Sequence, residues 1–356
     1  MLNSCGKYKM TNIEIRNSGS YTVRIGSGLL DTIGDEVKAL GKVNKVCVVT
    51  DDHVSELYGD RVCDSLTAAG FNVSRFVFPF GEKSKSLSTY SELVEYLCNG
   101  RFTRSDLIVA LGGGVVGDLA GFAAATFQRG IRYIQVPTTL LAAVDSSVGG
   151  KTAVDLAGGK NQVGCFYQPS LVLCDPDTLK TLPEEEYRCG CAEVIKYAIL
   201  RSRRFYDELM ELPASSQFEH VIATCVEMKK EYVQEDEFDT GARMFLNLGH
   251  TIGHAVETLS GYTSLHGQAV AIGMAAIARS SVRQGFCSQN TVDGIIAILE
   301  KYGLPIENPY PAGKIIDVML SDKKLISGKL NLIVPEEIGK CRIVAVDTDR
   351  LSDWVL

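Results

Sequence analysis

The sequence lacks the features of a membrane-spanning, secreted or nucleic-acid-binding protein. Its uncharged apolar runs, such as residues 269–278, are far too short to cross a bilayer. The first residues contain neither an apolar core nor a cleavage site, so we expect no secretory signal. Met1 and Met10 are both candidates for the first residue of the translated protein. The formal charge is −7, whereas a nucleic-acid-binding face must be basic. We therefore expect a cytoplasmic protein whose partners include neither a membrane nor a nucleic acid.

The eleven cysteines likewise lack the pattern of a disulfide framework. They are odd in number and scattered, and several, such as Cys47 and Cys174, lie inside apolar segments. The one close pair, Cys189 and Cys191, does not have the spacing of a zinc ribbon. We interpret the cysteines as reduced thiols in the core of a cytosolic protein.

The chain has 356 residues, more than a single typical core, and 46% hydrophobic with 22% charged residues is usual for a globular protein. In the first half, β-rich runs alternate with helical patterns such as residues 89–98. The β-rich runs are residues 45–50, 71–78, 107–111 and 132–136. This alternation predicts parallel strands covered by helices, as in a Rossmann-like domain.

From about residue 182 the spacing of apolar residues becomes helical, and β-rich runs return only at residues 329–334 and 341–346. The sequence therefore predicts two domains. The first is an α/β domain with a parallel sheet at residues 1–181, and the second is mostly α-helical at residues 182–356.

A glycine-rich run, Gly-Gly-Gly-Val-Val-Gly-Asp at residues 112–118, follows the third β-rich run and precedes an apolar helical segment. This order allows backbone amides at a helix N-terminus to approach a pyrophosphate. A standard dinucleotide motif follows the first strand and has an acid about 20 residues later, which this chain lacks. Asp51, at the end of an earlier strand, could bind the ribose instead. A tight turn that packs helix on strand is the alternative.

Residues 137–161 combine hydroxyls, lysines and glycines at high density. Lysine supplies positive charge and glycine lets the backbone approach closely, so the segment suits a phosphate or a polyhydroxylated anion. Because Lys151, Lys160 and Asn161 stand among apolar neighbours rather than in a charge run, we favour a binding site over a solvated loop.

Histidine is scarce, yet three of the five histidines lie within residues 250–266. His250 and His254 are four residues apart, so on a helix they share a face, and His266 can return from the next segment to meet them. The pattern favours a metal site over a cluster of core histidines. Glu193, three residues before Lys196, is a further metal-competent group. Taken alone, this pair is better explained as a helix-surface ion pair. The isolated basic residues that recur in the second half, such as Lys229 and Arg243, shift the balance towards a site.

Together these blocks resemble the 3-dehydroquinate synthases, a family of sugar-phosphate cyclases. The order and spacing of the blocks carry the resemblance, which covers most of the chain. The blocks are residues 81–87, 112–118, 136–139, 145–151, 159–161, 193–196, 243–257, 266–267 and 322–324.

The resemblance implies an enzyme of the shikimate pathway of aromatic amino acid biosynthesis. Its substrate would be 3-deoxy-D-arabino-heptulosonate 7-phosphate and its products 3-dehydroquinate and phosphate. NAD would oxidise one substrate alcohol transiently, phosphate would leave by elimination, and reduction and an intramolecular aldol closure would follow. The resemblance also implies a bound divalent metal, Zn²⁺ or Co²⁺, and a homodimer.

The resemblance assigns roles residue by residue. The metal ligands would be Glu193, His250 and His266, which moves His254 from the metal to the substrate. The residues around NAD would be Asp51, Glu82, Lys85, Gly114, Val115, Val116, Gly117, Asp118, Thr138, Thr139, Lys151, Lys160, Thr178, Leu179 and Thr181. The residues around the substrate would be Asp145, Lys151, Lys160, Asn161, Lys196, Lys229, Arg243, Asn247, His254, either Lys323 or Lys324, and Arg129 across a dimer interface.

One departure from the family concerns the metal. Gln268 follows His266 and Gly267, where the family commonly has Glu, and a carboxylate there could orient a metal-bound histidine. The sequence alone therefore leaves the metal affinity open.

Three other functions compete with this interpretation. A cyclase that makes an inosose or a valiolone-type ring is disfavoured by Asp118 and by residues 148–152. A metal-dependent polyol dehydrogenase shares the fold and would release NADH stoichiometrically. A degenerate binding or scaffold protein is disfavoured because every expected metal and cation position is filled.

Overall fold

The computed structural model describes residues 10–321 and 328–355, and the chain divides into two compact units. Unit 1 comprises Met1–Leu182 and Ile222–Glu237, and unit 2 comprises Pro183–Val221 and Phe238–Leu356. The chain first passes from unit 1 to unit 2 after Leu182, one residue beyond the boundary expected after residue 181. A single boundary was expected, but the segment Ile222–Glu237, which includes Lys229, returns to unit 1.

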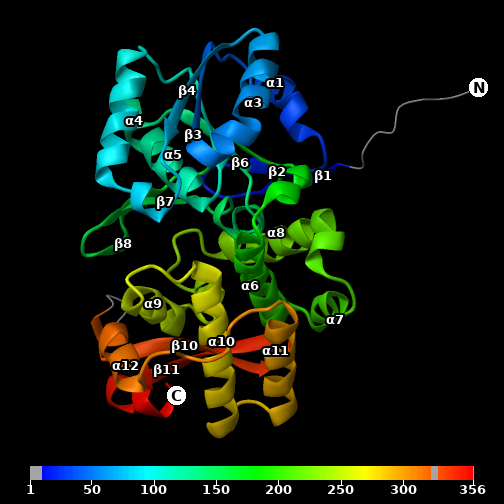
Figure 1. Cartoon of the computed structure of the whole chain (residues 1–356), viewed down its shortest axis with the longest axis vertical. Coiled ribbons are helices and arrows are strands. Elements are labelled where there is room, and N and C mark those ends of the chain that lie inside the picture. The colour runs from blue at the N-terminus through cyan, green and yellow to red at the C-terminus, as the bar shows by residue number, and fades with distance from the viewer. Residues whose placement is uncertain (1–9, 322–327, 356) are drawn as a thin grey trace, which may run out of the picture. The chain divides into compact units, whose positions relative to one another are not determined.

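Unit 1 is built on a seven-stranded sheet with the order β1-β2-β9-β6-β5-β3-β4 (Figure 1). The edge strand β1 pairs with β2 antiparallel, and every other neighbouring pair is parallel. The strands are β1 (Thr11–Ile15), β2 (Tyr21–Ile25), β3 (Lys45–Asp51), β4 (Asn72–Phe78), β5 (Leu107–Gly112), β6 (Arg132–Pro137) and β9 (Leu171–Cys174). The predicted fold class is confirmed, and β1, β2 and β9 are strands that were not among the predicted β-rich runs.

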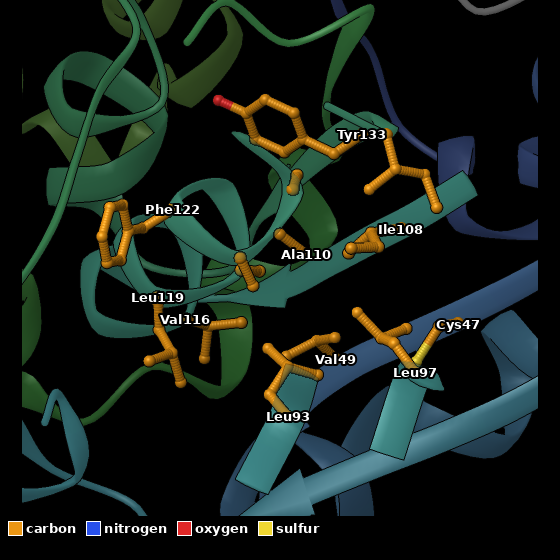
Figure 2. Packing of buried hydrophobic residues seen from close by; sticks show 14 of the residues in the cluster. Cys47, Val49, Leu93, Leu97, Ile108, Ala110, Val116, Leu119, Phe122 and Tyr133 are labelled. Carbon is orange, nitrogen blue, oxygen red and sulfur yellow. The ribbon is translucent and has the colours of Figure 1, made fainter. Parts of the chain in front are cut away.

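Both faces of the sheet are covered by helices, and the alternation of side chains along β3 divides the core in two. Val46 and Val48 pack on one side with residues of α1 and α3, while Cys47 and Val49 pack on the other with residues of α4 and α5 (Figure 2). These helices are α1 (Leu29–Ala39), α3 (Asp60–Ala68), α4 (Leu87–Asn99) and α5 (Gly114–Thr126). Burial raises the pKa of the Cys47 thiol to about 12, as suits a core cysteine.

Unit 1 also contains an antiparallel hairpin outside the main sheet, formed by β7 (Lys151–Leu156) and β8 (Gly159–Phe166). The sequence indicated only a glycine-rich segment here. The shorter elements of unit 1 are α2 (Asp52–Val54), η1 (Ser55–Gly59), η2 (Glu82–Ser84), η3 (Phe127–Arg129), η4 (Ala142–Ser146) and η5 (Pro176–Thr181). Most of α8 (Phe218–Glu235) also belongs to unit 1.

Unit 2 is mostly helical, as predicted, with one antiparallel hairpin of β10 (Lys329–Glu337) and β11 (Lys340–Asp347). Its helices are α6 (Glu184–Arg201), α7 (Arg203–Glu211), α9 (His250–Leu259), α10 (His266–Arg283), α11 (Gln289–Lys301) and α12 (Ala312–Ser321), with η6 (Ala214–Ser216), η7 (Ala242–Asn247) and η8 (Thr348–Asp353). Helix α10 packs against α6, α9 and α11. In the part of the chain that the structure describes, no helix is long and apolar enough to cross a membrane.

Glycines bring α9 and α10 into close contact. A Cβ at Gly273 would lie 1.9 Å from the carbonyl oxygen of Gly249, and a Cβ at Gly253 would lie 2.9 Å from that of Ala269. Gly249 itself has a φ of 78° at the start of α9, a conformation that favours glycine. The histidines at the starts of the two helices are therefore held at a separation that only glycines permit.

We expect Gly273→Ala to push α9 and α10 apart, which lowers the free energy of unfolding by about 1–3 kcal/mol, the usual cost of overpacking. Thermal unfolding of the purified variant measures this loss. The matched control is Gly313→Ala in α12, where a Cβ would meet nothing within 4 Å. That control should leave stability unchanged or raise it by up to about 1 kcal/mol. Equal stability of the two variants would contradict the close packing.

Candidate functional site

In unit 2, the three predicted metal ligands converge from three helices. Nε2 of His250 lies 3.4 Å and Nε2 of His266 lies 3.2 Å from the same oxygen of Glu193, Oε1. The three donor atoms all lie within 4.8 Å of one another. Two imidazoles and a carboxylate at this spacing fit a divalent ion such as zinc and leave further coordination positions for other ligands.

The charges of this cluster favour the binding of a cation. Burial alone would raise the pKa of Glu193, but Lys196 and His250 hold it well below its ordinary value, so the carboxylate is charged. Burial lowers the pKa of His250, which keeps its imidazole neutral as a ligand must be. Burial would lower the pKa of His266 too, but its contacts with Glu193 and Glu257 raise it to about 10. Because the two carboxylates raise the pKa of His266, its ring carries an extra proton in the metal-free protein, and a divalent ion would displace the proton on Nε2.

Other predicted residues of unit 2 surround the cluster. Lys196 is buried on α6 with Nζ 2.6 Å from Oε2 of Glu193, so the pair is internal rather than a surface ion pair. His254 lies one turn beyond His250 on α9, with its ring centroid 5.4 Å from that of His250 and 6.1 Å from that of His266. His254, Glu257 and His266 form a second group of donor atoms within 4.8 Å.

Two predicted substrate residues, Arg243 and Asn247, lie on η7, directly before α9. Arg243 is buried, and Nδ2 of Asn247 donates to the carbonyl oxygen of Met244 at 3.1 Å. The predicted lysine at 323 or 324 lies outside the described residues.

In unit 1, the glycine-rich run builds the N-terminus of α5. The helix begins at Gly114, so residues 114–118 of the glycine run are already part of its first turns. The N-cap is Gly113, which has no side chain to offer the first amides. A Cβ at Gly113 would lie 2.9 Å from Cγ2 of Thr139, and one at Gly117 would lie 2.6 Å from Oε1 of Gln135. The bare backbone of this helix N-terminus fits a pyrophosphate.

The threonines predicted to bind NAD differ in their hydrogen bonds. Thr138 is buried directly after β6, and its Oγ1 has no hydrogen-bond partner among the described residues. A buried hydroxyl without a partner is costly, so a polar ligand group would satisfy it. In η5, Oγ1 of Thr178 donates to the carbonyl oxygen of Asp175 at 2.8 Å, and Oγ1 of Thr181 lies 2.6 Å from the hydroxyl of Tyr58. The hydroxyls of these two threonines therefore hydrogen-bond within unit 1 and stabilise η5.

A buried lysine joins several predicted NAD residues. Nζ of Lys85 lies 2.9 Å from Asp118, 3.5 Å from Glu82 and 4.0 Å from Asp155. Burial would lower the pKa of Lys85, but these carboxylates outweigh it and raise the pKa above its ordinary value. Lys160, on β8, lies 3.4 Å from Glu82 as well. The network ties the first turns of α5 to η2 and to the β7–β8 hairpin.

Asp51, the predicted ribose ligand, ends β3 and caps the next helix. Its Oδ1 accepts from the backbone N–H of Val54 at 2.8 Å, and burial raises the pKa of the carboxyl group. β3 and β5 are neighbours, so Asp51 and the glycine turn both follow the carboxyl ends of adjacent parallel strands. That edge of a parallel sheet is where ligands usually bind.

The predicted substrate-binding residues of unit 1 lie on four segments, which are α8, η4, the β7–β8 hairpin and η3. Lys229 of α8 is buried and pairs with Asp145 of η4, donating to both its carboxylate and its backbone oxygen. Lys151 begins β7 and is exposed, and Asn161 lies on β8 with a φ of 55°. Arg129 ends η3 with a φ of 64°, next to Gly130.

Two residues of these clusters were missed from the sequence. Asp155 contacts Lys85 and also accepts from the backbone N–H of Asn161 at 2.7 Å, but the β7–β8 hairpin that carries it was not predicted. Glu257 contacts His266 and was detectable, because it lies seven residues after His250 and therefore on the same face of α9.

Comparison with solved structures identifies the class of protein. The crystal structure of 2-deoxy-scyllo-inosose synthase with carbaglucose-6-phosphate, NAD⁺ and Co²⁺ is 26% identical, with a TM-score of 0.87 over 97% of this chain and 100% of that one. The structure of 2-epi-5-epi-valiolone synthase from Streptomyces hygroscopicus with NAD⁺ and Zn²⁺ is 25% identical, with a TM-score of 0.87 over 96% and 97%. The fold is that of the sugar-phosphate cyclases.

Comparison with sequence families is more specific. The N-terminal model of 3-dehydroquinate synthase matches residues 75–189 and the C-terminal model matches residues 190–325. The 3-dehydroquinate synthase of Pelobacter propionicus is 46% identical over 93% of this chain and 95% of its own length, and that of Enterococcus faecalis is 43% identical over 94% and 96%. The chain belongs to the 3-dehydroquinate synthase family, so the resemblance drawn from the motifs is confirmed.

Proposed function

We propose that this chain converts 3-deoxy-D-arabino-heptulosonate 7-phosphate to 3-dehydroquinate and phosphate, the reaction of the family to which it belongs. The observation that carries the proposal is the convergence of Glu193, His250 and His266 in a protein of this family. We propose that these three residues hold Zn²⁺ or Co²⁺. When bound, NAD supplies reversible hydride transfer and the divalent ion polarises substrate oxygens.

Unit 1 supplies the residues proposed to hold NAD. The backbone of α5 from Gly114 to Asp118 receives the pyrophosphate, while Asp51 accepts from a ribose hydroxyl and Thr138 uses its unpaired Oγ1 on the cofactor. Lys85 fixes Asp118 and Glu82 in place. These groups bind and orient the cofactor, which lowers the entropic cost of hydride transfer.

Fixed cations are proposed to bind the carboxylate and phosphate of the substrate. The residues proposed for this role are Lys151, Lys160, Lys229 and Arg129 of unit 1, and Lys196 and Arg243 of unit 2. Asn161 and Asn247 add neutral hydrogen bonds, Asp145 orients Lys229, and His254 holds or releases a proton near the substrate. Lysine and arginine suit these roles because they stay charged and donate several hydrogen bonds at once.

We also propose that the protein acts in the cytoplasm as a homodimer in which Arg129 reaches the partner's substrate. This rests on the family resemblance and on the position of Arg129 in a tight turn after α5. Light scattering of the purified protein should give twice the chain mass of 38.7 kDa. A monomer with full activity would contradict the role of Arg129.

The test of function follows two products at once. The purified protein, with NAD and Zn²⁺, is given 3-deoxy-D-arabino-heptulosonate 7-phosphate while phosphate release and NADH absorbance are recorded. The proposed reaction releases phosphate and forms 3-dehydroquinate without accumulation of NADH, because the oxidised alcohol is reduced again. A polyol dehydrogenase would instead accumulate one NADH for each substrate oxidised. Dehydrogenases do share the fold, as the 17% identical butanol dehydrogenase of Thermotoga maritima shows with a TM-score of 0.64.

A further inference from the structure

His266 uses its two ring nitrogens in opposite directions. Nε2 lies 3.2 Å from Glu193 and so faces the proposed metal position, while Nδ1 lies 3.3 Å from Oε2 of Glu257. A neutral imidazole carries one proton, on one of these nitrogens. If the metal takes Nε2, the proton stays on Nδ1, where Glu257 is placed to accept it.

The carboxylate of Glu257 is buried beside His266. Its side chain is 3% exposed, and it points from α9, seven residues after His250 and three after His254, toward the start of α10. A buried carboxylate must be paired or hydrogen-bonded, and Oε2 of Glu257 lies within hydrogen-bonding distance of Nδ1 of His266. Burial and contact therefore both direct this carboxylate to the ring of His266.

The other histidine ligand is held in the same manner by a different group. Nδ1 of His250 lies 3.1 Å from the carbonyl oxygen of Leu248, which accepts its proton and leaves Nε2 free for the metal. Both imidazoles thus have an acceptor behind Nδ1, a backbone carbonyl in one case and a carboxylate in the other. Such acceptors fix the tautomer and ring orientation of a metal-bound histidine and make it a stronger ligand.

We propose that Glu257 is a positioning residue for the metal, which holds His266 in the tautomer and orientation that present Nε2 to the ion. This inference rests on the proposed metal ligands Glu193, His250 and His266. It also answers the question raised by Gln268. The carboxylate behind His266 is supplied by Glu257 of α9, so a glutamate at position 268 is not required for this contact.

The second donor group, His254, Glu257 and His266, is better explained by this role than by a second metal. A metal there would have to take Nδ1 of His266 while the first metal took Nε2, which requires loss of both ring protons. A hydrogen bond from Nδ1–H to Glu257 requires no such loss. One metal ion for each chain is therefore expected.

The test measures metal binding directly. The dissociation constant of Co²⁺ is determined by chelator competition for the full-length protein and for Glu257→Gln and Glu257→Leu, and the visible absorption of bound Co²⁺ is recorded. Loss of a partner behind a ligand typically costs about 10–100-fold in metal affinity. We expect a loss of that size for Glu257→Gln, a larger loss for Glu257→Leu because Leu has no acceptor, and a changed Co²⁺ spectrum in both.

Controls separate this role from a structural one. Glu300→Gln, an exposed change on α11, should bind Co²⁺ as the unaltered protein does. Glu257→Gln keeps the size of the side chain, so its NAD affinity should be unchanged even if Glu257→Leu folds poorly. A dissociation constant within twofold of the unaltered protein for Glu257→Gln, or two ions bound for each chain, would overturn the inference.

His250→Ala, measured in parallel, distinguishes the two proposals. If it does not weaken Co²⁺ binding, the proposed metal site itself is wrong. If it weakens binding and Glu257→Gln does not, the metal site stands and only the role of Glu257 fails.

Discussion

Replacement of His250 by alanine is expected to abolish both turnover and tight metal binding. Nε2 of His250 lies 3.4 Å from Glu193, and its loss leaves one imidazole and one carboxylate, too few for a three-residue site. Loss of a group behind a ligand costs about 10–100-fold in metal affinity, so loss of a ligand itself should cost more than about 100-fold. Equilibrium dialysis against Zn²⁺ measures the affinity, and phosphate release measures the turnover.

His220→Ala is the matched control for this experiment. His220 is a half-exposed residue whose Nε2 lies 2.9 Å from Glu208 on the surface of unit 2, and it has no contact with the metal cluster. This control should retain metal and activity. Full activity of His250→Ala, or of the unaltered protein in metal-depleted buffer, would contradict a metal-dependent mechanism.

The second large effect is expected for Lys151→Ala. Lys151 begins β7, is exposed and lies on the hairpin that also carries Lys160 and Asn161. If its ammonium group binds an anionic group of the substrate, its loss removes a charge-assisted contact worth about 2–5 kcal/mol in a desolvated site. At 1.36 kcal/mol for each factor of ten, kcat/KM should fall by roughly 30-fold to several-thousand-fold. Steady-state kinetics of phosphate release measure the fall.

Stability should not follow activity in this variant. An exposed lysine away from the core contributes within about 0.5 kcal/mol to the free energy of unfolding, so thermal unfolding of Lys151→Ala should match that of the unaltered protein. Lys42→Ala, an exposed lysine of unit 1 outside the predicted site, controls for a general loss of positive charge. An unchanged kcat/KM for Lys151→Ala would mean that the anion binds elsewhere.

The metal site was only partly predictable from residue spacing. Scarcity of histidine pointed to His250, His254 and His266, and helical spacing alone suggested His250 and His254 as a pair. The resemblance to a family assigned Glu193 rather than His254 as the third metal ligand. In the structure, Glu193 lies close to both His250 and His266. Spacing could not supply Glu193, because it stands on α6, far from both histidines in the sequence.

The residues predicted to bind the cofactor were also only partly predictable from the sequence. The glycine run after β5 was predictable because strand, glycines and helix are consecutive in the chain. The contact of Lys85 with Asp118 and Asp155 was not, because it joins η2, α5 and a hairpin that the sequence did not predict. Lys229 was expected to belong to the second half of the chain, yet its segment packs with unit 1, where it pairs with Asp145.

Residue order and spacing were enough to predict local features, namely the buried parallel strands, the glycine turn that opens α5, and the helical face shared by His250 and His254. These follow from neighbours a few residues apart, so periodicity and backbone preferences suffice. Which of these groups come into contact depends on how the helices pack in three dimensions. Gly249, Gly253 and Gly273 let α9 and α10 pack closely enough for His250 and His266 to face Glu193, and Glu257 to reach His266. Such contacts depend on how side chains fill the space between helices, which sequence spacing does not encode.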